Sequence, residues 1–160
     1  MKICIALLLT LVSFQANAQS SDTLPVKIKN LGSHWKHGKV GGDLWHCILV
    51  PENITKDELI AVAKALFKDQ PGYYRFFTDD KELKAFIASD AHYMDDSHAL
   101  YPYPEKWANK HYLAMINKHP TLGYLGEWAL WAQSLSGLKF AASPTDSLII
   151  TLGKADKPIQ

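Results

Sequence analysis

The sequence predicts one α+β domain, built on a mixed β-sheet of about five or six strands with two main helices packed mostly on one face. Three observations lead to this prediction. A strand-helix-strand-helix pattern opens the globular part, strand-like segments follow it, and residues 19–160 are a length that fits one domain.

The first residues have the three parts of a secretory signal. Lys2 supplies the positive start, residues 3–14 are mainly apolar, and an Ala-x-Ala motif ends at Ala18. The apolar run is shorter than the roughly 20 residues that span a bilayer. We expect cleavage before Gln19 and export of residues 19–160 to the periplasm or the medium, without a membrane anchor.

Two strands are predicted before the first helix. Residues 26–29 alternate apolar and basic side chains, which indicates a half-buried strand. Residues 32–42 are rich in Gly, His and Lys and predict a loop that exposes His34 and His37. Residues 44–50 are a continuous apolar run, which is typical of a strand buried on both faces.

The first helix is predicted from its cap. Thr55 and Glu58 have the spacing of a capping box. Apolar residues then follow with helical spacing, and Pro71-Gly72 ends the element. Because a strand is predicted on either side of this helix, the two strands should be parallel neighbours.

The next segments continue the pattern. Residues 73–78 predict a strand, and Asp79 or Asp80 is expected to cap a second helix. The inner face of that helix would carry Leu83, Phe86 and Ile87. Residues 89–104 then predict a long loop.

The C-terminal third is less regular. Residues 105–110 predict a short helix and residues 112–117 a strand. Residues 122–135 fit either a helix or a strand, and their glycines and tryptophans favour the strand. Two further strands are predicted at residues 138–142 and 148–152.

Charge and cysteine content exclude some classes of protein. Without Lys2, residues 19–160 hold 16 basic and 16 acidic residues, which argues against a nucleic-acid partner and against adhesion to an acidic membrane surface. Cys47 is the one cysteine of these residues, so an intrachain disulfide is excluded and the fold depends on its core.

Cys47 is a candidate nucleophile with an obstacle. His46 is adjacent, but neighbours on a strand point to opposite faces, so His46 cannot act as the base for Cys47. A catalytic role would need another histidine brought in by the fold. The alternative is that Cys47 packs as a small core residue.

The predicted loop carries a candidate metal site. It holds two imidazoles and two carboxylates, from His92, Asp95, Asp96 and His98. Their spacing fixes no ligand pair on a helical turn. A solvated loop is therefore the preferred interpretation; no cofactor is otherwise expected.

An aromatic cluster follows in the same region. Tyr93, Tyr101, Tyr103 and Trp107 lie among prolines, a composition that suits a recognition surface with little conformational entropy to lose. The alternative is that the rings cover one edge of the sheet.

Three functional hypotheses follow. The first is an exported binding protein (an inhibitor, immunity-type or accessory protein) whose partner is another extracytoplasmic protein. The second is a metal-dependent hydrolase or metal-binding protein that uses the loop between His92 and His98. The third is a cysteine-dependent enzyme that uses Cys47. Catalytic motifs are otherwise absent, which favours the first hypothesis.

Overall fold

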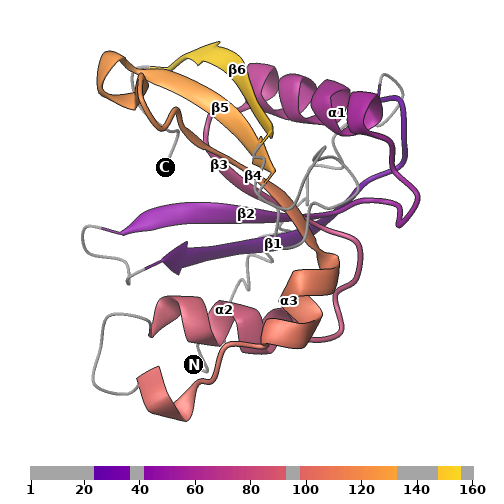
Figure 1. Ribbon diagram of the computed structural model, residues 1–160, viewed down its shortest axis with the longest axis vertical. Coiled ribbons are helices and arrows are strands. Elements are labelled where there is room, and N and C mark those ends of the chain that lie inside the picture. Colours follow the sequence, from indigo (N-terminus) through magenta and orange to yellow (C-terminus); the bar gives the residue numbers. More distant parts are fainter. Residues whose placement is uncertain (1–23, 37–41, 93–97, 133–147, 156–160) are drawn as a thin grey trace, which may run out of the picture.

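The computed structural model describes residues 24–36, 42–92, 98–132 and 148–155. These residues form one mixed sheet of six strands, arranged in space in the order of the sequence (Figure 1). Three α-helices pack on this sheet in the described part of the chain. The structure thus confirms the α+β fold and the predicted number of strands.

The elements have the following bounds. The strands are β1 Lys29–Lys36, β2 Asp43–Leu49, β3 Tyr73–Phe77, β4 Tyr112–Lys118, β5 Glu127–Ala132 and β6 Leu148–Lys154. The α-helices are α1 Lys56–Asp69, α2 Leu83–Ala91 and α3 Glu105–His111. Two short 3₁₀ turns complete the described elements, η2 His98–Leu100 and η3 Gly123–Leu125. None of the helices in the described ranges has the length and apolar character needed to cross a bilayer.

The β2–α1–β3 crossover forms as predicted. Strands β2 and β3 pair in parallel, with Cys47 opposite Arg75. The other neighbouring strands in this sheet pair antiparallel. A parallel pair needs a crossover connection, and α1 supplies it.

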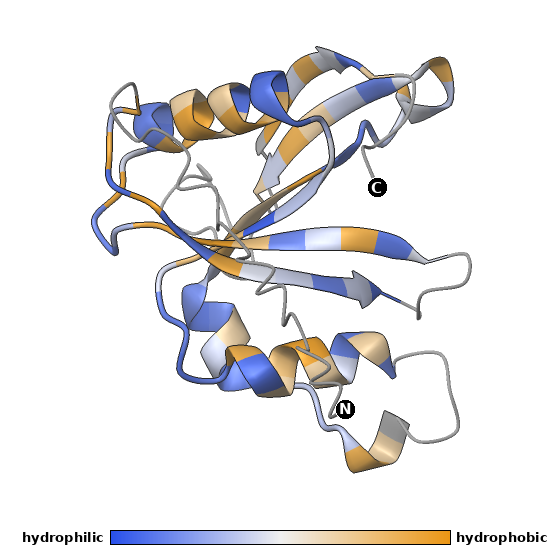
Figure 2. Cartoon of the chain, turned by 180° about the vertical axis from the view of Figure 1, so that it is seen from behind, coloured by the Kyte–Doolittle hydropathy of each residue, from blue (hydrophilic) through white to orange (hydrophobic). Residues whose placement is uncertain are grey.

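The predicted capping box starts α1. The Glu58 N–H donates to Thr55 Oγ1 at 3.3 Å, and the Thr55 N–H donates to Glu58 Oε2 at 2.8 Å. Polar and apolar residues alternate along the helix with helical spacing (Figure 2). The apolar stripe, buried against the sheet, contains Leu59, Val62, Ala63, Leu66 and Phe67.

Helices lie on both faces of the sheet, which corrects the prediction that they pack mostly on one. Helix α1 covers one face, and α2 with α3 lie on the other (Figure 1). Ile48 and Phe76 belong to the core under α1, whereas Cys47 and Phe77 belong to the core under α2 and α3. The prediction was wrong because α2 and α3, which connect β3 to β4, lie on the face of the sheet opposite α1.

Strand β1 begins at Lys29, the last residue of the strand predicted at residues 26–29, and lies mostly in the segment predicted as a loop. The predicted bounds of this strand are therefore wrong. Its pairing with β2 continues through Lys36, past a register shift between Asn30 and Ser33. Gly32 lies in this bulge with φ of 99°, a conformation that glycine adopts without strain. Gly32 therefore marks a bulge inside a strand, and the predicted loop is wrong for residues 32–36. Residues 37–41 of the predicted loop lie outside the described residues.

Helix α2 begins later than predicted. Its N-cap residue is Glu82, without a side-chain capping bond, so neither Asp79 nor Asp80 is the N-cap. Asp79 Oδ1 instead accepts a 2.6 Å hydrogen bond from the Lys81 N–H. An aspartate that bonds the backbone two residues on makes a turn, and this turn precedes the helix.

The C-terminal elements follow the predictions where the structure describes them. Helix α3 and strands β4 and β6 cover the predicted segments. The open question at residues 122–135 resolves in favour of a strand, β5, after the η3 turn. The strand predicted at residues 138–142 lies outside the described residues.

Candidate functional site

The loop after α2 exposes a small apolar surface. We call this the tyrosine surface; it consists of Leu100, the last residue of η2, and of Tyr101 and Tyr103, which precede α3. Leu100 is 76% exposed, Tyr101 37% and Tyr103 50%. Exposed apolar side chains that lie together, instead of scattered singly, are a feature of interaction surfaces.

Neighbouring rings hold the two tyrosines in place. The Tyr101 ring stacks on the His92 ring, with centroids 4.0 Å apart and an interplanar angle of 11°. The Tyr103 ring packs at 5.7 Å from Phe86 of α2, and burial raises its pKa. Because Pro102 fixes the backbone between them, the rings are largely pre-organised.

Trp107 packs against Phe86, the ring that also contacts Tyr103. Its ring is buried and lies 5.6 Å from Phe77 and 6.1 Å from Phe86, centroid to centroid. Its indole Nε1–H donates to Asp79 Oδ1 at 3.5 Å. Of the predicted binding residues, Tyr101 and Tyr103 are thus exposed, Trp107 belongs to the core, and Tyr93 lies outside the described residues.

The predicted metal ligands are only partly described. His92 ends α2 as its C-cap and stacks on Tyr101. Asp95, Asp96 and the side chain of His98 lie outside the described residues. Within the ranges that the structure describes, no three His, Cys, Asp or Glu side chains are placed to share a metal ion. The metal site stays a prediction.

The fold brings a histidine to Cys47. His34, predicted to be exposed in a loop, is buried on β1, and its Nδ1 lies 3.6 Å from Cys47 Sγ. His34 Nε2 lies 3.2 Å from Asp90 Oδ2 at the end of α2. With Nε2 protonated, His34 donates to Asp90 and accepts from the thiol. His46 faces away and bonds Ser33 instead, as the alternation of strand side chains predicts.

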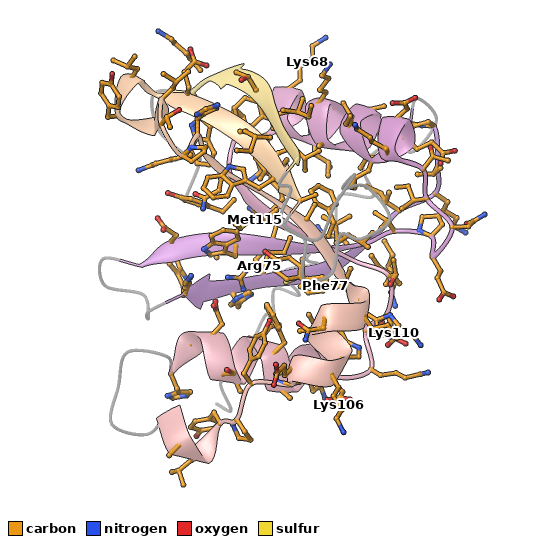
Figure 3. The ribbon with its side chains drawn as sticks, viewed as in Figure 1. Lys68, Arg75, Phe77, Lys106, Lys110 and Met115 are labelled. Atoms are coloured by element: carbon orange, nitrogen blue, oxygen red, sulfur yellow. The ribbon has the colours of Figure 1, made fainter. Side chains whose placement is uncertain are left out.

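Arg75 completes this buried network, which we call the Arg75–Asp90 network. Its Nη1 and Nη2 donate to Asp90 Oδ2 and Oδ1 at 3.0 and 3.1 Å. The guanidinium carbon lies 4.3 Å from the Trp45 ring centroid and 5.0 Å from that of Phe86. Figure 3 shows Arg75 and Phe77 on β3, on the side of the sheet that faces α2 and α3. The network therefore fastens α2 to the sheet.

The protonation of the network favours a structural role. Burial raises the pKa of the Cys47 thiol to about 11, although the charge of Arg75 opposes the shift. Burial also opposes ionisation of Asp90, but hydrogen bonds from His34 and Arg75, with the charges of Arg75 and Lys36, hold its pKa well below the usual range. A fully buried, protonated thiol beside a carboxylate already held by arginine is not an activated nucleophile.

Sequence reasoning missed three participants. Arg75 interrupts the apolar run Tyr-Tyr-Arg-Phe-Phe, and an arginine inside a buried strand needs a buried carboxylate, so this signal was present. His34 was predicted to be exposed because the Gly and Lys residues near it are typical of a loop. Leu100 carried no distinguishing signal, because a single exposed leucine is common.

Comparison of the chain with protein families, with curated proteins and with solved structures finds no match in any of the three.

Proposed function

We propose that the chain is an exported interaction protein that recognises another extracytoplasmic protein through the tyrosine surface. One observation carries this proposal: Leu100, Tyr101 and Tyr103 are exposed together on a segment whose rings are held by His92 and Phe86. Ordered tyrosines lose little conformational entropy when they bind, and they are enriched at protein interfaces.

Charge is consistent with a protein partner. The equal numbers of basic and acidic residues after Lys2 leave no excess positive charge of the kind that nucleic-acid-binding proteins carry. Recognition would then depend on apolar contact at the tyrosine surface and on polar groups around it. Such a small surface supplies the central contacts of an interface, and surrounding residues exclude water.

The test compares three tagged chains in their own host. The wild type, a Tyr101→Ala/Tyr103→Ala double variant and a Tyr124→Ala control are recovered from detergent-extracted envelope and secreted fractions, and co-purifying proteins are quantified by mass spectrometry. Tyr124 is a matched control because it is also an exposed tyrosine, on the η3 turn. We expect one stoichiometric protein that the double variant loses at least about tenfold, as interface hot spots predict, and that the control retains.

Two results would contradict the proposal. One is capture of the same protein at equal yield by the wild type and the double variant. The other is the absence of any protein that depends on Tyr101 or Tyr103, with the variants shown to be folded by circular dichroism.

A second candidate function is thiol chemistry at Cys47. The observation that favours it is the contact of Cys47 Sγ with His34 Nδ1, with Asp90 behind the same ring. The enclosed thiol would have to be uncovered before it could react. Rapid alkylation of the native protein, at a rate near that of the unfolded chain, would support this candidate over the structural role.

A further inference from the structure

A second apolar surface lies at the turn between β4 and β5. Leu122, Tyr124 and Leu125 are all exposed there, and Tyr124 is 82% exposed. We call these three residues the hairpin tip. The turn projects at the end of the sheet away from α2 and η2 (Figure 1), and apolar colouring marks it in Figure 2.

Backbone hydrogen bonds make the hairpin tip rigid. The Gly123 N–H donates to the His119 carbonyl at 2.8 Å, and the Leu125 N–H donates to the Leu122 carbonyl at 3.0 Å. The His119 ring accepts at Nδ1 from the Leu122 N–H at 3.1 Å. Gly126 closes the turn with φ of 80°. The apolar side chains are therefore held outward by a fixed backbone.

Two glycines suit this geometry. A Cβ at Gly123 would lie 3.0 Å from Lys118 Cβ, a tight contact that would require Lys118 to move by a few tenths of an ångström. Gly126 needs its left-handed conformation. The turn is thus built to bring its backbone close to the end of β4 while its large side chains point away from the core.

The hairpin tip follows a lysine. Lys118 is the one formally charged residue of residues 118–126, which contain no aspartate or glutamate. The next acidic residue, Glu127, has an ion-pair partner in Lys154 at 3.9 Å. The equal charge balance of residues 19–160 therefore does not hold within residues 118–126, where the charge is that of Lys118.

We propose that the hairpin tip docks on an anionic lipid surface. Leucine and tyrosine suit the headgroup boundary of a bilayer, where an amphipathic ring has both an apolar and a wet side. Lys118 supplies the charge that attracts anionic headgroups. A protein pocket is the alternative occupant, because tyrosine is enriched at protein interfaces. Lysine is depleted there, so Lys118 favours the lipid surface. This docking is reversible and does not rest on the function proposed for the tyrosine surface.

The test is co-flotation of the full chain with vesicles. Phosphatidylcholine vesicles are compared with vesicles that contain about 30% phosphatidylglycerol, which supplies the anionic surface that lysine recognises. The wild type should bind the anionic vesicles and lose binding in high salt. Tyr124→Ser/Leu125→Ser should lower the partition coefficient about tenfold or more, because it removes apolar area that enters the boundary. Lys118→Gln should lower it about fivefold.

The control is Tyr101→Ala, which removes an exposed tyrosine at the other end of the molecule and should float like the wild type. Failure of the wild type to float with anionic vesicles overturns the proposal, and so does equal flotation of the Tyr124→Ser/Leu125→Ser variant. If that variant instead loses a host protein while the wild type ignores vesicles, the hairpin tip is a protein interface and the proposal is wrong. Thermal unfolding of each variant confirms that it is folded.

Discussion

Arg75 and Asp90 form a bidentate ion pair between β3 and α2, with two hydrogen bonds of 3.0 and 3.1 Å. The Arg75 side chain is 4% exposed and the Asp90 side chain 14%. This pair lies between the sheet and the helix whose end carries His92. The stability of the tyrosine surface is therefore linked to a buried charge pair.

Removing one partner of this pair should destabilise the protein strongly. Asp90→Asn leaves the Arg75 charge buried without compensation, and we expect a loss of about 3 kcal/mol or more in the free energy of unfolding. The matched control is Asp80→Asn, because Asp80 pairs with Lys29 at an exposed site, where a pair contributes at most about 1 kcal/mol. Urea unfolding measures both. Equal losses of unfolding free energy in the two variants would show that the buried pair stabilises the protein no more than the exposed pair does.

Acid should lower the free energy of unfolding through protonation of Asp90. The folded-state pKa of Asp90 lies below the ordinary value of 3.8, because hydrogen bonds from His34 and Arg75 outweigh the effect of burial. A group with a depressed pKa contributes stability above its unfolded pKa and loses it as the pH falls toward the folded value. The free energy of unfolding of the wild type should therefore fall below about pH 5.

The control for this pH dependence is again Asp90→Asn, which cannot titrate at that position. Its stability should change less between pH 5 and acid than that of the wild type. Parallel pH profiles for the two proteins would place the acid sensitivity at other carboxylates.

The Cys47 thiol should be unreactive in the native protein. Its raised pKa of about 11 keeps it protonated at neutral pH, and the side chain is fully buried. We expect alkylation at pH 8 to be slow in buffer and fast in urea, since labelling then requires unfolding. The rate in buffer should follow the stability of the variant tested. Fast labelling of the stable wild type would favour the thiol-enzyme hypothesis.

Substitutions at Trp107 and Tyr101 should differ in their cost to the free energy of unfolding. Trp107→Ala empties the space beside Phe77 and Phe86, and we expect a cost of about 3–5 kcal/mol. Tyr101→Ala removes a partly exposed ring, and its cost should stay within about 1 kcal/mol. Chemical denaturation of the two variants checks this. A large loss in Tyr101→Ala would mean that the ring is a core residue.

Local signals predicted much of the fold. The Thr55–Glu58 capping box placed α1, and the apolar runs at residues 44–50 and 73–78 placed the parallel pair. What local patterns could not give was the partner of each residue. Gly32 looked like a loop residue because only pairing with β2 shows that it is a bulge. Likewise, Asp79 resembled a cap, whereas its hydrogen bond forms a turn ahead of α2.

The candidate site was predicted less completely. The tyrosines at residues 101 and 103 were identified from their composition with proline, and the structure exposes both. Trp107 could not be separated from them, because exposure depends on α2 and on Phe77, which lie far along the chain. The contact of His34 with Cys47 also depends on strand register, which the sequence alone did not specify.

The most direct test of the proposed function is site-specific photo-crosslinking in the host. A photoreactive phenylalanine analogue replaces Tyr101 in one chain and Lys68 in another; Lys68 is exposed on α1, on the opposite side of the sheet (Figure 3). The account predicts one discrete adduct with another exported protein from position 101 and none from position 68. Absence of an adduct from position 101, or the same adduct from both positions, would contradict recognition through the tyrosine surface.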